Sequence, residues 1–540
     1  MAARNWQTVA YEQQAILREA LPQQWLLKTA PPESVLNVMD VPYTSGIMTE
    51  RELHLTEKDA TTLIEMLAKR EVTSYDLTLA FCKRATIAQQ VINCLTQLFV
   101  DEALQQAKEL DDYLEKNHKV IGPYHGLPFS IKDQINIKGK DSSGGFVSRV
   151  GWIAAEDAPT VKLLREAGAV FYCKTNNPQT LMHLESNSNI YGRTVNPFNR
   201  SLTCGGSSGG EGALVGFRGA PIGLAADGGG SIRSPAANNG VYGMKTTSGR
   251  IPTANSTRPM NGCESFPVVV GPICRSARDF EYFQTVILDR EPWKAHPAMV
   301  PIRWRQQPTP DKLTIGVFSD DGVCRPHPPV EAAIAKLTAR LSKSPDIKVV
   351  QWEPYKHDYG YDLIQKLFFE DGGDTMWKAM KESGEPALPL TEWILNRPQS
   401  KRRTIEESWA LNVERESYRK EYLDYWNQHP EVDVLLCPVG PGVAPKHDTS
   451  RYWGYTAIFN CLDWPAIAFP TGLSVSIAEH PIDATYQPRD NEYDQYNWPQ
   501  YDPEVYREAP ISLQLVGKKW DCEIVMAALR KLELELTKYP

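Results

Sequence analysis

Several features that mark membrane, secreted and nucleic-acid-binding proteins are missing from this 540-residue sequence. No run approaches the roughly 20 apolar residues of a membrane-spanning helix. The formal net charge is −8, from 66 acidic against 58 basic residues, whereas a nucleic-acid-binding protein normally carries a basic excess. We therefore expect no membrane span and no nucleic-acid partner, and a small molecule as the binding partner.

Paired cysteine motifs are missing as well. The ten cysteines are scattered without CxxC spacing, which disfavours a disulfide framework and a zinc ribbon. The first 25 residues contain no basic segment followed by an apolar stretch, so we expect no signal peptide. These observations predict reduced thiols in a cytoplasmic protein.

Helical and strand patterns alternate along the chain. Apolar spacing predicts helices over residues 5–28, on either side of a turn at 72–74, and over 101–116 and 158–168. Strands are predicted over residues 126–133, 169–174, 312–318 and 347–352. The strand GLPFSIKD (126–133) alternates apolar and polar residues, as a half-buried strand does, and its polar side carries Lys132. Helix alternating with strand predicts an α/β fold with a largely parallel, covered sheet.

Glycine is unusually dense between Thr203 and Arg250. Glycine allows positive φ and close approach of the backbone to a ligand. In GGSSGGEGALVGF, Ser208 and Glu211 form an S-x-x-E capping box, so Ser208 is expected to cap a helix. For its neighbour Ser207 two roles stay open: it is either catalytic or only part of a turn.

A second serine follows three consecutive glycines in DGGGSIRSP. Successive N–H groups near a helix start form an anion-binding concavity, and Ser234-Pro235 is expected to begin a helix. An acyl-transfer enzyme needs such donors for its oxyanion, with a nucleophile within ~3 Å of the same point. This favours Ser231 as a nucleophile, with a glycine-rich surface turn as the alternative.

A serine nucleophile needs a base, and none of the ten histidines lies between residues 203 and 250. A Ser-His-Asp arrangement stays open, because residues distant in sequence can meet in space. GGSSG (205–209) fits the G-x-S-x-G elbow of α/β-hydrolases, but NRSLTC before it is not an apolar strand. Lys132 is the rival base, although most lysines are surface charges. To act, its amine must be neutral, which requires a pKa well below ~10.4.

Together these motifs resemble the amidase signature family, closest to its fungal acetamidase-like, general-amidase branch. GGSSGGEGALVGFRGAPIGLAADGGGSIRSP reproduces the glycine and serine signature, and GLPFSIKD matches the lysine motif upstream. The spacing is also that of the family, with 75 residues from Lys132 to Ser207 and 24 from Ser207 to Ser231. Further likeness lies in KTNNPQ (174–179), NPFN (196–199), YTAIFNCLDWPAIAFPTG (455–472) and PISLQLVGKKWDCE (510–523).

The resemblance implies one α/β/α domain over residues 56–540, with a mixed, mostly parallel sheet, after an N-terminal helical extension over residues 1–55. It implies Ser231 as the acylated nucleophile, Ser207 as a bridging serine behind a cis peptide bond, and Lys132 as the base. It further implies oxyanion or substrate contacts from Gly228, Gly229, Gly230 and Leu181, and supporting roles for Ser208, Asp227 and Arg233.

The activity that the resemblance implies is hydrolysis of the carbon–nitrogen bond of small or aryl and acyl amides, through an acyl-enzyme and without a metal or organic cofactor. The partner is then an amide substrate, and the oligomeric state is open, with a homodimer as one option. Three alternatives stay open: a glutaminase subunit of a tRNA-dependent amidotransferase, an esterase, and a catalytically inactive scaffold.

Two positions depart from the family pattern. Ala226 stands where a threonine is usual, and Gly228 stands where a larger residue is usual. These changes predict a looser oxyanion loop and a changed acyl pocket. The loops near 256–270, 369–395 and 475–510 are expected to select the substrate. Their aromatic residues, Trp377, Trp393, Tyr486 and Tyr496, indicate either a bulky apolar substrate or packing of the loops alone.

Overall fold

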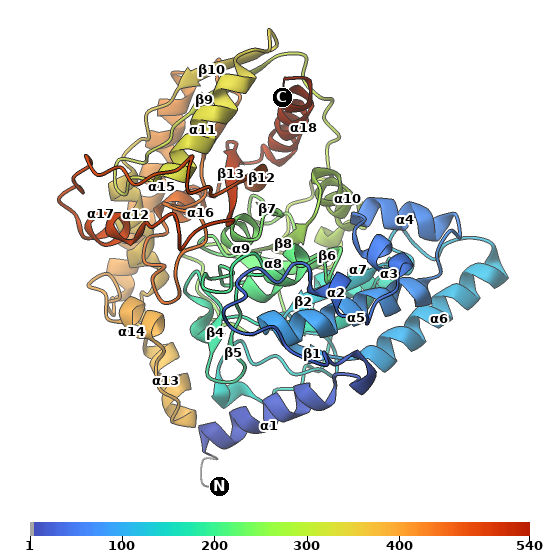
Figure 1. The fold of residues 1–540 in the computed structure, drawn as a ribbon. Coiled ribbons are helices and arrows are strands. Elements are labelled where there is room, and N and C mark those ends of the chain that lie inside the picture. The colour runs from blue at the N-terminus through green and yellow to red at the C-terminus, as the bar shows by residue number, and fades with distance from the viewer. Residues whose placement is uncertain (1–4, 540) are drawn as a thin grey trace.

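The computed structural model describes residues 5–539, which fold around one large β-sheet (Figure 1). The strands are β1 (Leu95–Leu98), β2 (Pro128–Lys132), β3 (Val170–Thr175), β4 (Asn187–Ser188), β5 (Gly192–Arg193), β6 (Ile222–Asp227), β7 (Tyr242–Lys245), β8 (Val269–Cys274), β9 (Leu313–Val317), β10 (Ile347–Gln351), β11 (Val434–Pro438), β12 (Ala466–Ser474) and β13 (Pro510–Val516).

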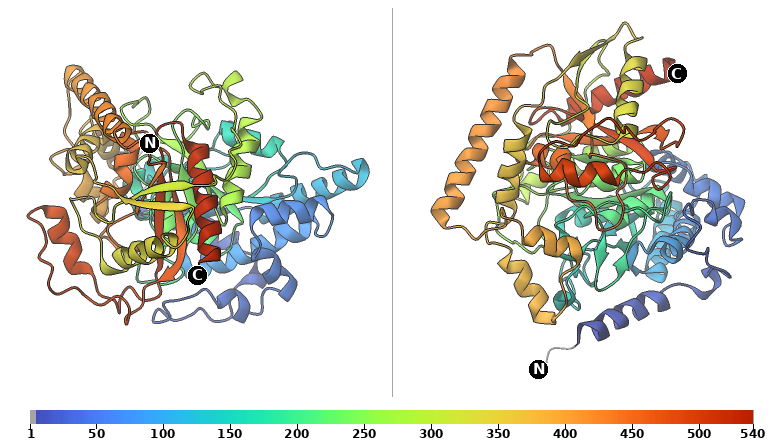
Figure 2. Two further views of the ribbon diagram at one scale, coloured as in Figure 1. Left: turned by 90° about the horizontal axis from the view of Figure 1, so that it is seen from above. Right: turned by 60° about the vertical axis from the view of Figure 1, so that its left-hand side comes forward.

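Helices surround the sheet on all sides (Figures 1 and 2). They are α1 (Trp6–Glu19), α2 (Val41–Thr44), α3 (Glu50–Thr56), α4 (Ala60–Ala68), α5 (Ser74–Ile92), α6 (Val100–Asn117), α7 (Pro159–Glu166), α8 (Gly209–Gly216), α9 (Arg233–Asn238), α10 (Ala277–Leu288), α11 (Pro328–Leu341), α12 (His357–Phe368), α13 (Asp374–Ser383), α14 (Pro389–Leu395), α15 (Ile405–Asn427), α16 (Gly454–Cys461), α17 (Glu492–Asn497) and α18 (Cys522–Lys538). Short 3₁₀ turns cover Gln23–Trp25, Val147–Arg149, Gln179–Leu181, Pro292–Lys294 and Trp498–Gln500.

The sheet has eleven strands in the order β1-β3-β2-β6-β8-β7-β12-β13-β11-β9-β10, and β4 pairs with β5 separately. The predicted α/β fold with a mixed sheet is confirmed. The expectation that the sheet is mostly parallel is wrong, because only β2 with β3 and β6, and β9 with β10 and β11, run parallel. The other neighbours in this sheet are antiparallel, since β8, β7, β12, β13 and β11 alternate in direction through its middle.

Local signals set several element ends as predicted. Pro159 begins α7, and Gly168 follows its end with φ +94°. The side chain of Thr73 accepts the N–H of Asp76 and so caps α5, which places the turn near residues 72–74. In the second half of the chain, β9 and β10 confirm the strands predicted over 312–318 and 347–352, and α11 lies between them.

Two expected elements differ from the structure. The helix predicted over 5–28 ends at Glu19, because Pro22 lacks the N–H that a continuing helix would need. The strand β2 is buried on both faces rather than on one. Its Phe129 and Ile131 belong to the main hydrophobic core, and α8 covers the face that carries Ser130 and Lys132.

The main hydrophobic core runs from the N-terminal helices to α18. It includes Val9 and Leu17 of α1 and Trp25, so the expected N-terminal extension packs against the body of the protein. The boundary at residue 55 stays a prediction. A second, aromatic cluster lies around α12, α15 and α16 and includes Trp426 and Trp464. Within residues 5–539 no helix is long and apolar enough to cross a membrane.

The central strand β13 offers a direct test of this core. Leu515 is fully buried between Leu436 of β11 and Ile467 of β12. We expect Leu515→Ala to lower the free energy of unfolding by about 2–5 kcal/mol, because it leaves a cavity in a close-packed layer. Urea-unfolding midpoints measure the change. Leu534→Ala on α18 is the matched control, since Leu534 is 48% exposed and should change stability by no more than about 0.5 kcal/mol. Equal effects of the two variants would contradict the described burial.

Candidate active site

The glycine-rich segment forms two turns that meet beside the end of β2. The first turn, Gly205–Ser208, leads into α8, and the second, Gly228–Ile232, joins β6 to α9. The two turns are in contact, because the N–H of Ser208 donates to the carbonyl of Ser231 at 3.2 Å. The backbone of Gly206 approaches Glu185 so closely that a Cβ there would lie 2.3 Å from the Glu185 carbonyl oxygen. Glycine is therefore required at that position.

Lys132 and Ser207 form the central contact of the site. Lys132 ends β2, and its Nζ donates a hydrogen bond to Ser207 Oγ at 2.7 Å. Both residues are buried, Lys132 completely. The peptide bond between Gly206 and Ser207 is cis, as the family resemblance implies.

The surroundings of Lys132 favour its neutral form. Burial lowers the pKa of the Lys132 ammonium to about 7, although the negative charges of Asp227, Glu211 and Asp133 act in the opposite direction. Among residues 5–539, Lys132 Nζ donates its hydrogen bond to Ser207 and none to a carboxylate. A buried amine of this kind can take up a proton near neutral pH.

A cavity of about 70 Å³ opens onto this contact. Ser231 faces it with 8% of its surface exposed. The cavity brings together most of the predicted site residues, namely Lys132, Leu181, Ser207, Gly228, Gly229 and Ser231. Within the described residues, no group of three or more histidine, cysteine or acidic side chains is arranged to hold a metal ion.

The N–H of Gly230, expected to contact the oxyanion or the substrate, makes a hydrogen bond within the protein. Its N–H donates to Asp227 Oδ1 at 2.8 Å, so this group is already bonded and is not free to hold an oxyanion. Its φ is +132°, and a Cβ would lie 2.3 Å from Thr456 Oγ1. Gly230 therefore serves the packing of the turn against α16.

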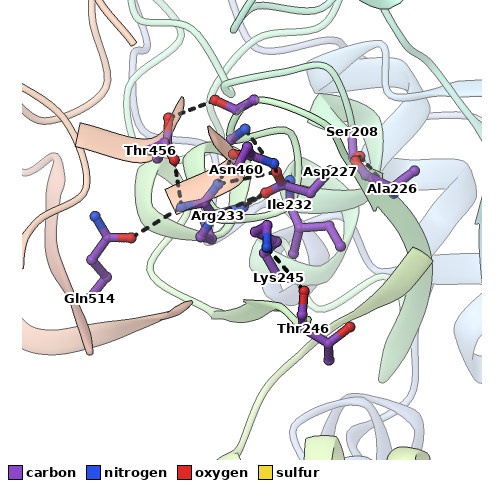
Figure 3. A network of polar contacts seen from close by, with 12 residues as sticks. Ser208, Ala226, Asp227, Ile232, Arg233, Lys245, Thr246, Thr456, Asn460 and Gln514 are labelled. Carbon is purple, nitrogen blue, oxygen red and sulfur yellow. Dashed lines mark hydrogen bonds and ion pairs between the residues drawn. The ribbon is translucent and has the colours of Figure 1, made fainter. Parts of the chain in front are cut away.

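A buried ion pair holds the second turn from behind (Figure 3). Arg233 and Asp227 are both fully buried, and Arg233 donates to the carboxylate through Nε at 3.1 Å and Nη2 at 3.2 Å. Burial raises the pKa of Asp227, but the charge of Arg233 and the hydrogen bonds outweigh it and hold the pKa well below its usual range. Asp227 also accepts the N–H groups of Ile232 and Arg233. One carboxylate thus organises the whole turn.

This carboxylate also explains where α9 begins. The helix was expected to begin at Ser234-Pro235, but it begins at Arg233. Asp227 supplies the acceptor for the first N–H groups, so no serine cap is needed.

The capping box expected at Ser208 is absent. Ser208 does precede α8, but its hydroxyl donates to the carbonyl of Ala226 at 3.1 Å instead of capping the helix. Its partner in the expected box, Glu211, instead accepts from Ser130 Oγ at 2.6 Å and Thr175 Oγ1 at 2.8 Å. Ser208 therefore ties the first turn to β6, the strand that carries Asp227.

The cavity wall is mainly apolar. Phe266 and Phe368 meet edge to face with centroids 4.8 Å apart, and Trp453 continues the wall beyond Phe368. Gly228 and Gly229 face this wall, since Cβ atoms there would lie 3.1 Å from Val268 and Phe368 respectively.

The four aromatic residues singled out in the sequence do not line this cavity. Trp377 packs against the second core cluster, Trp393 and Tyr496 flank Arg451, and Tyr486 packs on Arg325 and Trp498.

The segment that supplies Leu181 has an unusual backbone. Thr180 and Leu181 have φ values of +67° and +64°, which non-glycine residues adopt at a cost of about 1–2 kcal/mol each. The next residues include His183, which also borders the cavity. Burial lowers the pKa of His183 to about 4, and Thr391 Oγ1 lies 3.4 Å from its Nε2. Within residues 5–539, Lys132 hydrogen-bonds to Ser207, whereas no histidine hydrogen-bonds to Ser207 or Ser231.

A family model described as amidase matches residues 76–525. The chain belongs to the amidase signature family.

Named relatives agree with this membership. A homologue in Schizosaccharomyces pombe that carries an amidase name is 44% identical over 98% of this chain and 99% of that protein. The acetamidase of Emericella nidulans is 41% identical over 97% of each chain. Among solved structures, a fatty acid amide hydrolase superposes with a TM-score of 0.95 at 35% identity, covering 99% of this chain and 95% of that one.

Three residues of this amidase escaped the sequence reasoning. Thr456 Oγ1 donates to the carbonyl of Gly229 at 2.8 Å, Asn460 Nδ2 donates to Asp227 Oδ1 at 3.0 Å, and Gln514 Oε1 lies 3.5 Å from Arg233 Nη1 (Figure 3). Thr456 and Asn460 lie in α16, more than 220 residues after the turn that they hold. Their stretch, 455–472, was part of the family likeness, and this was the available signal.

The ion pair behind the turn is testable through stability. Asp227→Asn leaves Arg233 buried without its counter-charge, so we expect the amidase to lose about 3–5 kcal/mol of unfolding free energy. Asp374→Asn is the matched control, because Asp374 pairs with Arg402 at the surface and should contribute no more than about 1 kcal/mol. Chemical denaturation at neutral pH compares the two variants. A loss in Asp227→Asn as small as in the control would contradict the structural role of the pair.

Proposed function

We propose that this amidase hydrolyses amides with an apolar acyl group through an acyl-enzyme on Ser231, with Ser207 and Lys132 moving the proton. The observation that carries the proposal is the 2.7 Å hydrogen bond between the buried Lys132 amine and Ser207 Oγ, at the edge of the cavity that Ser231 faces. A lysine that is fully buried and not hydrogen-bonded to a carboxylate is suited to act as a base, because its neutral form is accessible at neutral pH.

Acylation then begins with transfer of two protons. The neutral Lys132 amine accepts the proton of Ser207 Oγ while Ser207 Oγ accepts that of Ser231. Ser231 Oγ forms a bond to the substrate carbonyl carbon, and the carbonyl oxygen becomes an oxyanion. The carbon–nitrogen bond then breaks, while Lys132 returns its proton to Ser207 Oγ and Ser207 Oγ gives its own proton to the leaving nitrogen.

The oxyanion is assigned to the N–H groups of Gly228, Gly229 and Ser231. Gly228, Gly229 and Ser231 border the cavity, whereas the N–H of Gly230 is bonded to Asp227. The peptide unit from Gly229 to Gly230 is held at both polar ends, by Thr456 at the carbonyl and by Asp227 at the N–H. A donor set fixed before the reaction stabilises developing charge without further reorganisation.

Deacylation uses the same groups in reverse. Water attacks the acyl carbon, its proton passes to Ser207 and Lys132, and the bond from Ser231 Oγ to the acyl carbon breaks. The proton then returns to Ser231, which leaves the carboxylic acid product and the free enzyme. The cycle balances without a cofactor.

The apolar wall of the cavity favours a substrate whose acyl group is apolar. Phe266, Phe368 and Trp453 form an aromatic surface, and Gly228 leaves space where a side chain would otherwise project. The names of two relatives, an acetamidase and a fatty acid amide hydrolase, span short and long acyl groups. We assign small to aryl-sized acyl amides to this chain.

Labelling with a fluorophosphonate probe tests the nucleophile. We expect the wild-type enzyme to be labelled and Ser231→Ala to lose all labelling, because the probe reacts with an activated serine. The wild-type labelling rate should rise with pH through about 7, since the base is active only when Lys132 is deprotonated. Mass spectrometry of the labelled peptide measures the site.

Ser234→Ala is the matched control, because Ser234 lies three residues away in α9 and takes no part in the proposed relay. This variant should be labelled as fast as wild type. Full labelling of Ser231→Ala would end the assignment, and an unlabelled wild-type enzyme would favour an inactive scaffold.

The space at Gly228 gives a test of specificity. A Cβ at Gly228 would lie 3.1 Å from Val268 and 3.4 Å from Phe266, so Gly228→Val fills the side of the cavity next to the aromatic wall. We expect the ratio of kcat/KM for benzamide to kcat/KM for acetamide to fall about tenfold or more, because the larger acyl group loses its space. Steady-state kinetics with both amides measure this ratio. An equal fall for both substrates would mean that Gly228 supports the oxyanion turn and does not set acyl size.

A further inference from the structure

Glu211 is a fully buried acid with no role in the relay described above. It lies in the first turn of α8, and its carboxylate accepts Ser130 Oγ at 2.6 Å and Thr175 Oγ1 at 2.8 Å. No lysine or arginine forms an ion pair with it among the described residues. Burying a charged carboxylate without an ion-pair partner costs free energy, and the two hydroxyl hydrogen bonds offset only part of that cost.

The sheet is shaped to receive this carboxyl group. Gly223 of β6 lies beside Ser130 of β2 in the register, and a Cβ on Gly223 would lie only 1.8 Å from Glu211 Oε2. Thus a hydroxyl from β2 and one from β3 donate hydrogen bonds to the carboxylate, and a glycine in β6 leaves the space that it occupies.

The same strands place the group beside Lys132. Ser130 precedes Lys132 by two residues on β2, so their side chains lie on one face of the sheet. Thr175 is the register partner of Lys132 on β3. Both hydrogen bonds to Glu211 therefore come from immediate neighbours of the lysine.

We propose that Glu211 is a positioning residue for the Lys132 base. It is a buried acid on the face of the sheet that carries Lys132, and its charge sets how readily the amine gives up its proton. This rests on the proposed function, in which Lys132 must be neutral to act. A negative Glu211 favours the protonated lysine, and a protonated Glu211 releases it.

Three titratable groups near Glu211 stay neutral. Burial raises the pKa values of Cys94, Tyr172 and Cys173 well above their usual range, so these groups remain neutral. Asp227 also acts on Lys132 but is paired with Arg233, and Asp133 is held by hydrogen bonds from Thr96, Ser143 and Gly144. Burial raises the pKa of Glu211 to about 7, although Ser130, Thr175 and Lys132 act in the opposite direction, so its charge varies in the same pH range as that of Lys132.

The experiment is the pH dependence of fluorophosphonate labelling in wild type and Glu211→Gln. Glutamine keeps the shape and removes the charge, so the proton leaves Lys132 more easily. We expect the acid limb of the labelling rate to move to lower pH by about one unit, which makes labelling about tenfold faster below the wild-type limb. An acid limb at the wild-type pH would overturn the proposal, even if the variant were less stable.

Glu535→Gln is the matched control, because Glu535 is 1% exposed and accepts Ser344 Oγ at 2.8 Å in α18, away from the site. Its acid limb should not move. If Glu211→Gln does not fold, Thr175→Val removes one hydrogen bond from the carboxylate and makes it easier to protonate, so the limb should move in the same direction by a smaller amount. A limb that moves up or stays in place in this variant would overturn the proposal. Wild-type enzyme that is never labelled would instead contradict the proposed function.

Discussion

The burial of one amine, that of Lys132, is the constraint on which the rest of the site depends. Out of water, a lysine loses its preference for the charged state unless a carboxylate pairs with it. The chain buries Lys132 at the end of β2 under α8, and gives its hydrogen bond to Ser207. The nearby acids are occupied elsewhere: Asp227 by Arg233, Asp133 by hydroxyls and an N–H group, and Glu211 by two hydroxyls. The site is thus arranged so that several acids lie close to the amine without forming an ion pair with it.

The second turn, unlike Lys132, is held by a direct ion pair. Asp227 and Arg233 are paired directly, and together they make eight hydrogen bonds to the turn, to each other and to α16. An ion pair with this many hydrogen bonds keeps both of its charges, and it holds the second turn rigidly in place. The site therefore combines Lys132, which exchanges protons in the proposed reaction, with the Asp227 and Arg233 pair, which keeps its charges.

Much of this could be predicted from the sequence, and the limits have physical causes. Local glycine spacing favoured Ser231, whereas the roles of Ser207 and Lys132 were left open by the residues themselves and were implied only by the family resemblance. The contacts of Ser208 and Gly230 were missed, because Ser208 bonds to Ala226 of β6 and the N–H of Gly230 bonds to a side chain. The direction of strands in the middle of the sheet was missed, since periodicity within a strand says nothing of its neighbours. Thr456 and Asn460 lie in a stretch of family likeness, but their contacts with the turn arise only through the fold.

The location of α16 has a consequence for how the protein is made. The turn that holds Ser231 is tied by hydrogen bonds to Thr456 and Asn460, and Gln514 of β13 completes the same network. During synthesis, a chain that has already produced Ser231 still lacks these partners, and the strand β13 that joins β12 to β11 comes later still. A growing chain on the ribosome therefore carries all of its proposed reacting groups, Lys132, Ser207 and Ser231, long before it can hold them in order. The network that holds the turn around Ser231 can therefore be complete only once β13, the last strand, has been made.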